Sequence, residues 1–429
     1  MKIFLRFVLA LVVLIAVAVT WLSWGGSIAP VPRSASKVAE ATLRDPALIA
    51  RGHYLATIGD CAACHTEQGG APYAGGRALA TPFGNITAPN ITPDKATGLG
   101  DWSFEDFWQA LHSGRGRHGQ YLYPVFTYTS YTKVHRDDAL AIFAYLQSLP
   151  AVSRPSNPPA LDFPYSVRGS LKAWRALYFK EGQYQTDASR SATWNRGAYL
   201  VQGLGHCNEC HIARDALGGA RDDISLSGGQ MPEQNWFAPD LSTQAHGGLE
   251  GWTDQDIVDL LKTGKSTRGV AFGPMAEVVV RSTQHMSDED LGAIAQYLRS
   301  LPARPVPPVQ DVSFDTKALA DHGKDVYKQY CSDCHGSDGK GKSDIYPGLD
   351  GNASVIEPSG ANATRVVLLG GFAPATQANP RPYSMPPFAQ QLSDADVAAV
   401  VTYIRTAWSN QASLVRERDV SGLRHTPSD

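Results

Sequence analysis

The sequence predicts an all-α protein in which three tandem domains, with much irregular loop, follow an N-terminal helix. Two observations predict this fold class. The pattern Cys-x-x-Cys-His occurs three times, as CAACH at residues 61–65, CNECH at 207–211 and CSDCH at 331–335. Each occurrence is followed along the chain by a segment whose apolar residues recur at helical spacing. A chain of 429 residues is also long enough for about three domains.

Cys-x-x-Cys-His is the sequence to which a c-type haem is covalently attached. The two thiols form thioethers with the porphyrin, and the histidine binds the iron from one side. All six cysteines lie in these strings, whereas a redox dithiol or a zinc site would not repeat with an adjoining histidine each time. We therefore expect three covalently bound haem c groups, with Cys61, Cys64, Cys207, Cys210, Cys331 and Cys334 as attachment residues and His65, His211 and His335 as iron ligands.

The three repeats follow one plan. A helical segment with a glycine and a tyrosine precedes each string (Gly52 and Tyr54, Gly197 and Tyr199, Gly323 and Tyr327). Each repeat closes with a helix whose buried stripe follows the i, i+3, i+4, i+7 spacing: Ile142, Tyr145, Leu146 and Leu149; Leu291, Ile294, Ala295 and Leu298; Val397, Val400, Val401 and Ile404. Ser287 and Ser393 are expected N-caps, and residues 102–113 and 252–263 are expected middle helices. A closing helix packed across the helix that carries the attachment site is the plan of cytochrome c.

We place the three cytochrome c domains at residues 46–160, 186–305 and 306–410, because proline-rich segments lie at 153–164 and 302–308. Residues 25–45 are a linker. Residues 161–185 form a second linker segment, whose amphipathic part we expect to pack between domains. Residues 411–429 are a polar tail.

Residues 1–24 contain an apolar run, 7–22, that follows Lys2 and Arg6. The run is long for a signal peptide and slightly short for a membrane span. Trp21 and Trp24 lie at the end of this run, where interfacial aromatic residues belong. The pattern favours an uncleaved anchor that places the chain at the periplasmic face of the bacterial inner membrane; cleavage, which would leave a periplasmic protein, is the alternative. The formal net charge of −3 gives no indication of nucleic-acid binding.

The second ligand of each iron is the next question, because a histidine–methionine pair is typical of an electron carrier with a raised potential. Met275 and Met385 each precede a closing helix, in proline-containing loops. We expect them to bind the irons of the second and third haems. Met286 is expected to be a core residue, and Met231 to pack at the wall of the haem.

The first repeat has no methionine at this position, where Phe126 stands. Phenylalanine cannot bind iron, so the first haem is five-coordinate or takes another ligand. The candidates are His112, His118 and His135, with Lys133 behind them. His118 is the best of these, because it lies in a glycine-rich loop just before Phe126.

Each iron-binding histidine should donate its Nδ1–H to a carbonyl, which fixes the orientation of the ring. Pro89, Pro239 and Pro347 follow the three strings in similar contexts. We expect their carbonyls to be the acceptors.

Several further strings carry a resemblance to a known family: APNITPD at 88–94, LYP at 122–124, GPMAEVV at 273–279, STQHM at 282–286 and SMPPF at 384–388. With the attachment strings, they make the chain from about residue 47 to 408 similar to the triheme cytochrome c subunit of bacterial membrane-bound alcohol, sugar, gluconate and aldehyde dehydrogenases. In the alcohol and sugar branches of that family, methionine stands where this chain has Phe126. Phenylalanine there looks more like the aldehyde-oxidising or a related branch.

The resemblance implies an electron-transfer subunit with no catalytic residues of its own. Its partner would be a flavin, quinoprotein or molybdenum dehydrogenase, and it would pass electrons to ubiquinone or a terminal oxidase at the membrane. Two alternatives remain open on the sequence alone: a free triheme shuttle, and a haem enzyme that uses an open first haem.

Overall fold

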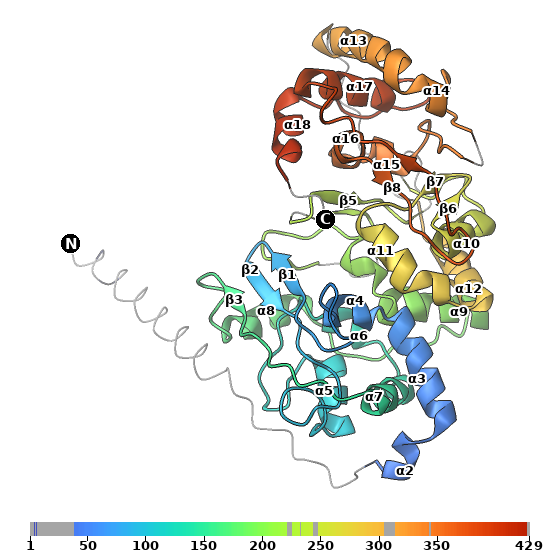
Figure 1. Cartoon of the computed structure of the whole chain (residues 1–429). Coiled ribbons are helices and arrows are strands. Elements are labelled where there is room, and N and C mark those ends of the chain that lie inside the picture. The colour runs from blue at the N-terminus through green and yellow to red at the C-terminus, as the bar shows by residue number, and fades with distance from the viewer. Residues whose placement is uncertain are drawn as a thin grey trace. The chain divides into compact units, whose positions relative to one another are not determined.

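Figure 1 shows the computed structural model of the chain, which describes residues 38–220, 225–231, 233–242, 248–303, 314–342 and 345–426, together with Phe4 and Arg6. It is mostly helical, with short strands and long irregular segments, which confirms the helical fold class. The expected signal or anchor helix over residues 1–24 lies outside the described residues, apart from those two. Within the part of the chain that the structure describes, no helix combines the length and the apolar composition that a membrane span requires.

The chain divides into two compact units. The first holds residues 38–56, 64–185 and 215–220, and the second holds residues 57–63, 186–214 and the described residues from 225 onward. The second and third expected domains therefore fall together in the second unit. The segment 57–63, which leads into the first attachment string, is grouped with them.

The first unit includes its closing helix, α7. Its described helices are α2 (Glu40–Leu43), most of α3 (Pro46–Ile58), the end of α4 (Cys61–His65), α5 (Phe104–Ser113), α6 (Tyr128–Tyr131), α7 (Arg136–Ser148) and α8 (Ser170–Tyr178). A small antiparallel sheet, which the helical patterns did not predict, has the strand order β1 (Ala78–Thr81), β2 (Gly84–Thr87), β3 (Ala160–Leu161). In its register Ala78 pairs with Thr87, and Gly84 pairs with Leu161.

The second unit contains the second and third repeats. Its helices are α9 (Ala192–Tyr199), a π-helical turn (Leu200–Leu204), two 3-10 turns (Cys207–Glu209 and Thr283–His285), α10 (Asp254–Thr263), α11 (Pro274–Arg281), α12 (Asp288–Arg299), α13 (Phe314–Tyr330), α14 (Ser332–His335), α15 (Ala353–Ile356), α16 (Ala361–Leu369), α17 (Asp394–Thr406) and α18 (Glu417–Arg424). Its described residues also form three two-stranded pairs: β4 (Gly229–Met231) with β5 (Trp236–Ala238), β6 (Lys265–Ser266) with β7 (Gly269–Val270), and β8 (Gly371–Phe372) with β9 (Ser384–Met385).

The helix before each attachment string packs closely against the closing helix, and a glycine makes this approach possible. The pairs are α3 with α7, α9 with α12, and α13 with α17 (Figure 1). A Cβ atom on Gly52 would overlap the carbonyl of Ala141; the same holds for Gly197 with Ala293 and for Gly323 with Ala399. Any side chain at these positions would force the two helices apart, so the expected helix pairs depend on these glycines.

An acidic residue in the first turn of each closing helix joins the same helix pair. Asp138 accepts from Nε of Arg51 at 3.0 Å, and Asp290 accepts from Nε of Arg196 at 2.7 Å. In the third repeat a histidine takes this place, with Nε2 of His322 at 2.9 Å from Asp396. The basic residue stands directly before the crossing glycine in every case. Each pair therefore joins the two helices within one helical turn of their close contact.

The expected helix caps are confirmed. The Ser287 hydroxyl accepts from the backbone N–H of Asp290, and Ser393 forms a reciprocal capping box with Asp396. The middle helices α5 and α10 begin two residues later than expected. The reason is that Ser103 and Thr253 cap them with capping boxes of their own.

Two segments outside the three expected domains pack onto them. Residues 161–185, for which we expect packing between domains, belong to the first unit, where α8 buries Leu171 and Arg175. The tail from residue 411 contains α18, whose Val420 is fully buried in the core of the third repeat. In this tail Arg424 donates to Asp394 at 2.5 Å. The tail thus includes a packed helix in addition to its polar residues.

Replacement of the crossing glycine in the second repeat tests the role of this contact. Gly197→Ala should lower the free energy of unfolding by about 1–3 kcal/mol, because the added methyl group overfills a tight contact. Gly292→Ala is the matched control in the same helix pair, because a Cβ there would meet nothing within 4 Å. The control should raise the free energy of unfolding by about 0.5–1 kcal/mol. Denaturant unfolding of the haem-loaded chain measures both, and equal effects of the two substitutions would contradict the close contact.

Candidate haem sites

The three attachment strings lie at the ends of helices but differ in local structure. CAACH forms α4, and CSDCH continues from α13 into α14. CNECH follows the π-helical turn and begins with a 3-10 turn, after His206 in a left-handed conformation with φ of 40°. The Cys-x-x-Cys-His string therefore has a different backbone conformation in each repeat.

Each histidine of the strings bonds to the expected proline carbonyl. Nδ1 of His65 lies 2.7 Å from the carbonyl oxygen of Pro89, and Nδ1 of His211 lies 2.7 Å from that of Pro239. Nδ1 of His335 lies 3.0 Å from that of Pro347. A carbonyl can only accept, so Nδ1 carries the proton in all three rings. The lone pair of Nε2 is then available for a metal ion, as an iron-binding histidine requires.

Burial shifts the pKa of the three histidines and of both cysteines of the second string. Desolvation lowers the pKa of His65, His211 and His335, although the proline carbonyl acts in the opposite direction. Desolvation also raises the pKa of Cys207 to about 12 and that of Cys210 to about 11. The rings are therefore neutral near pH 7. The thiols of Cys207 and Cys210 lack the thiolate character of a reactive redox pair.

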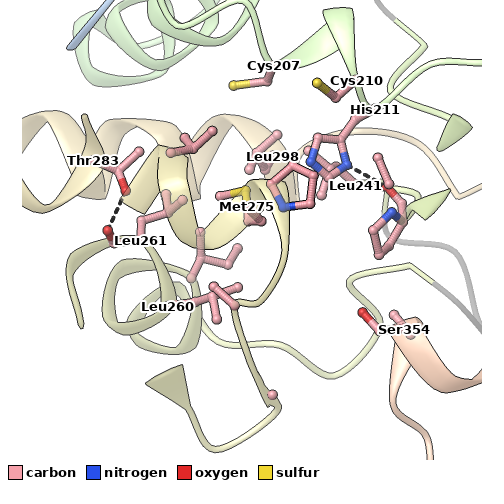
Figure 2. Close-up of a pocket in the computed structure, with 18 of the residues that line it drawn as sticks. Cys207, Cys210, His211, Leu241, Leu260, Leu261, Met275, Thr283, Leu298 and Ser354 are labelled. Atoms are coloured by element: carbon pink, nitrogen blue, oxygen red, sulfur yellow. Dashed lines mark hydrogen bonds between the residues drawn. The ribbon is translucent and has the colours of Figure 1, made fainter. Parts of the chain in front are cut away.

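The second repeat contains a cavity that brings four predicted residues together. Cys207, Cys210, His211 and Met275 all line it, and Figure 2 shows His211 and Met275 reaching into the same space. The rest of the wall is largely apolar and includes Leu200, Leu241, Ile257, Leu260, Leu261, Val278, Ile294 and Leu298. Two thiols and a neutral imidazole on one side, with a thioether in the same apolar cavity, fit a covalently attached haem.

Parts of this wall come from outside the second repeat. Ile58 and Asp60, from the segment that leads into CAACH, line the cavity, as do residues 352–354 of the third repeat. The segment is held there by two hydrogen bonds. Ser282 Oγ donates to the Ile58 carbonyl at 2.9 Å, and Nε2 of His206 lies 3.3 Å from the Gly59 carbonyl. Sequence reasoning missed these wall residues; only Ile58 and Asp60, which stand just before CAACH, carry a positional signal that could have pointed to them.

The other two methionines of the second repeat lie where the sequence places them. Met286 is 3% exposed, in the core, and also lines the cavity. Met231, in β4, lines the cavity as well. Both are wall residues beside Met275.

In the third repeat, Met385 lies in β9 and pairs with Gly371 of β8. Met385 and Cys331 are both partly buried against the third-repeat core, and His335 is 8% exposed. The predicted attachment residue and the predicted thioether therefore contact the same core.

A hairpin fixes which residue of the first repeat corresponds to Met275. The glycine that ends each middle helix accepts from a backbone N–H beyond the hairpin: that of Leu122 at 2.9 Å and that of Ala271 at 2.8 Å. Phe126 follows Leu122 by four residues, and Met275 follows Ala271 by four. The hairpin of the first repeat is one residue longer. The structural register therefore matches Phe126 with Met275, as the sequence predicts.

The histidines near this position differ in their surroundings. His112 donates from Nδ1 to the Thr132 carbonyl at 2.9 Å, and its Nε2 lies 3.6 Å from Glu181. His135 has its Nε2 at 3.3 Å from a backbone carbonyl. His118 is exposed in the hairpin loop, and its ring makes no hydrogen bond to another described residue. Of the three, His118 has the ring that is least engaged by the protein.

Comparisons with known proteins agree with this geometry. The cytochrome c family matches residues 49–150, 195–302 and 320–408, one match for each attachment string. The chain is 39% identical over 406 residues to the cytochrome c subunit of the alcohol dehydrogenase (quinone) of Gluconobacter oxydans, covering 90% of this chain and 84% of that protein. It is also 39% identical over 397 residues to the gluconate 2-dehydrogenase cytochrome c subunit of Pantoea cypripedii, covering 88% and 90%.

A third relative, the fructose dehydrogenase cytochrome subunit of Gluconobacter japonicus, is 35% identical over 405 residues, which are 88% of this chain and 82% of that protein. Cytochrome c domains imply covalently bound haem c, and the three matches fit the number of attachment strings. The chain therefore belongs to the cytochrome c family, among relatives named as cytochrome c subunits of dehydrogenases.

Proposed function

We propose that this chain is the electron-transfer subunit of a dehydrogenase complex, with three haems attached at its three strings. Catalysis would take place on a partner chain that carries a flavin, a quinoprotein cofactor or molybdenum. Electrons would leave to ubiquinone or a terminal oxidase. The partner's substrate would be an alcohol, a sugar acid or an aldehyde.

One observation carries this proposal: the cavity of the second repeat holds two thiols, a histidine and a methionine within apolar walls. When bound there, haem would supply a one-electron iron couple with the raised potential of histidine–methionine ligation. His211 would hold the iron from one side, oriented by the Pro239 carbonyl at 2.7 Å. Met275 would offer its thioether to the same iron, and the apolar wall would exclude water. The same residue types recur in the third repeat at His335 and Met385.

The names of the relatives support a dehydrogenase partner, because several are cytochrome subunits of such enzymes. The apolar run at residues 7–22 supports a further proposal, that the N-terminal segment anchors the chain at the periplasmic face of the bacterial inner membrane.

Purification of the tagged chain from its native membranes tests the function. A dehydrogenase polypeptide should copurify, and the α-bands of all three haems should appear when the substrate of that dehydrogenase is added. A short-chain ubiquinone should then reoxidise them. Recovery of a monomer that turns over peroxide rapidly, with no copurifying dehydrogenase, would contradict the proposal and favour a haem enzyme.

Substitution of Met275 tests the proposed thioether ligand. In Met275→Leu, one of the histidine–methionine low-spin signals in the EPR spectrum should disappear, because leucine cannot bind iron. Met286→Leu is the matched control, since Met286 is buried and lines the same cavity. It should keep the spectrum of the unchanged protein and cost less than about 1.5 kcal/mol of stability. An unchanged spectrum in Met275→Leu would rule out this ligand.

Introduction of methionine at Phe126 tests the assignment of the first haem. Phe126→Met should add one histidine–methionine low-spin signal and raise the midpoint potential of one haem. Val125→Met is the control, because Val125 follows Pro124 as Met275 follows Pro274, but it lies one residue off the hairpin register. A new signal in the Val125 variant alone would refute the structural register.

If His118 is the ligand in the unchanged protein, His118→Ala should convert that haem from low spin to high spin.

A further inference from the structure

The strand β5 contacts the segments that carry both predicted iron ligands of the second haem. It leads into Pro239, whose carbonyl accepts from Nδ1 of His211 at 2.7 Å. At its other end the indole of Trp236 packs against Gly273, which stands two residues before Met275. Trp236, Pro239, His211 and Met275 all line the same cavity. One short strand therefore supports the ligand segments of the imidazole and of the thioether.

The contact between Trp236 and Gly273 is close enough to fix where the next helix begins. A Cβ on Gly273 would lie 2.7 Å from an indole carbon, and the φ of Gly273 is 52°, in the region that favours glycine. Pro274 then begins α11, and Met275 is its second residue. The ring centre of Trp236 also lies 5.4 Å from that of Phe272. The position of the thioether therefore depends on where β5 holds the indole.

The strand is held in turn by α16 of the third repeat, which lies beside it (Figure 1). Nδ2 of Asn362 donates to the Phe237 carbonyl at 2.8 Å, and the Phe237 N–H donates to Oδ1 of Asn362 at 2.8 Å. The amide thus pairs with the middle of β5 as a residue of a neighbouring strand would. One helical turn later, the guanidinium carbon of Arg365 lies 4.6 Å from the ring centre of Trp236. Both side chains of α16 are buried.

The first repeat supports its corresponding strand with another strand. There β2 leads to Pro89 as β5 leads to Pro239, and β2 pairs with β1 on one edge and with β3 on the other. Among the described residues, β4 and β5 form a sheet of two strands. Asn362 therefore occupies the edge of β5 that corresponds to the edge which β3 covers in the first repeat.

We propose that Asn362 is a positioning residue for the second haem. By holding β5 it keeps the thioether of Met275 and the ring of His211 directed at one iron, and Arg365 assists through Trp236. A thioether is a neutral, weak donor, so its hold on the iron depends on how well the surrounding chain fixes it. A helix of the third repeat thus determines how firmly the second haem is ligated. This inference rests on the proposed ligation by His211 and Met275.

The experiment is an imidazole titration of the purified, haem-loaded full chain with ferric iron, followed by EPR. Imidazole displaces a loosely held thioether, so the imidazole midpoint, the concentration that removes half of a histidine–methionine signal, measures how firmly the methionine is held. The signal of the second haem is the one lost in Met275→Leu, and that of the third haem is the one lost in Met385→Leu. The pyridine haemochrome assay gives the haem content of each variant.

Asn362→Leu keeps a side chain of similar size and removes both hydrogen bonds to Phe237. Its imidazole midpoint for the second haem should fall by about tenfold, which corresponds to about 1.4 kcal/mol. The midpoint for the third haem should stay unchanged, although the substituted residue belongs to the third repeat. Trp236→Phe should lower the midpoint of the second haem as well, and it tests the same contacts if Asn362→Leu fails to fold.

Thr402→Val is the matched control in the third repeat. The Thr402 hydroxyl bonds to the N–H and the carbonyl of one residue, Val415, at 3.0 and 3.3 Å. Thr402 is buried like Asn362, and it is not among the described residues that line the cavity. Its variant should leave both imidazole midpoints within about twofold of those of the unchanged protein.

The proposal is overturned if Asn362→Leu retains three haems and leaves the midpoint of the second haem unchanged, or lowers both midpoints equally. It is also overturned if Thr402→Val lowers the midpoint of the second haem as much as Asn362→Leu does. If Met275→Leu removes no signal, the proposed ligation fails and this inference fails with it. An unchanged midpoint in Asn362→Leu, beside a lost signal in Met275→Leu, overturns the inference alone.

Discussion

The contact between a glycine and a main-chain carbonyl across two helices determines the rest of each repeat. Gly52, Gly197 and Gly323 allow the helix before each attachment string to lie directly against the closing helix. The string stands at the end of the first helix, and the loop with the methionine position leads into the second. Bringing these helices together therefore brings the attachment string close to the methionine position. The tyrosines that follow the contact, such as Tyr297 and Tyr403, add ring contacts with Trp194 and Tyr327 at 5.2 and 5.3 Å.

Around this shared contact the three repeats differ in which basic residue pairs with the aspartate of the closing helix. The first two pair an arginine with the aspartate of the closing helix, and the third uses His322. The third repeat also buries Arg405 completely, where it donates to the carbonyls of Val355 and Glu357 at 2.6 and 2.7 Å. Burial lowers the pKa of Arg405, and the nearby Glu357 opposes that shift. The repeats thus keep one backbone plan but stabilise it with different polar networks.

Much of this arrangement could be predicted from sequence because it depends on local patterns. Apolar spacing predicted the closing helices, serine–aspartate pairs predicted their caps, and the recurring prolines predicted the carbonyl acceptors at Pro89, Pro239 and Pro347. The π-helical turn before CNECH and the packing of α18 depend on tertiary contacts, so no local pattern indicates them. The buried Nε–H groups of Arg115 and Arg117, which have no acceptor among the described residues, were equally hidden. Whether an arginine has a partner is decided by residues distant in sequence.

The choice of proline carbonyls as acceptors has an evolutionary consequence. A side-chain acceptor such as aspartate can be lost through one codon change, but a main-chain carbonyl is present whatever residue stands there. The orientation of His65, His211 and His335 is therefore encoded in the path of the backbone rather than in the identity of a neighbour. Drift in the surrounding sequence can alter charge and polarity near each ring while its tautomer stays the same. Relatives that share about two residues in five with this chain can inherit this tautomer through loop geometry alone.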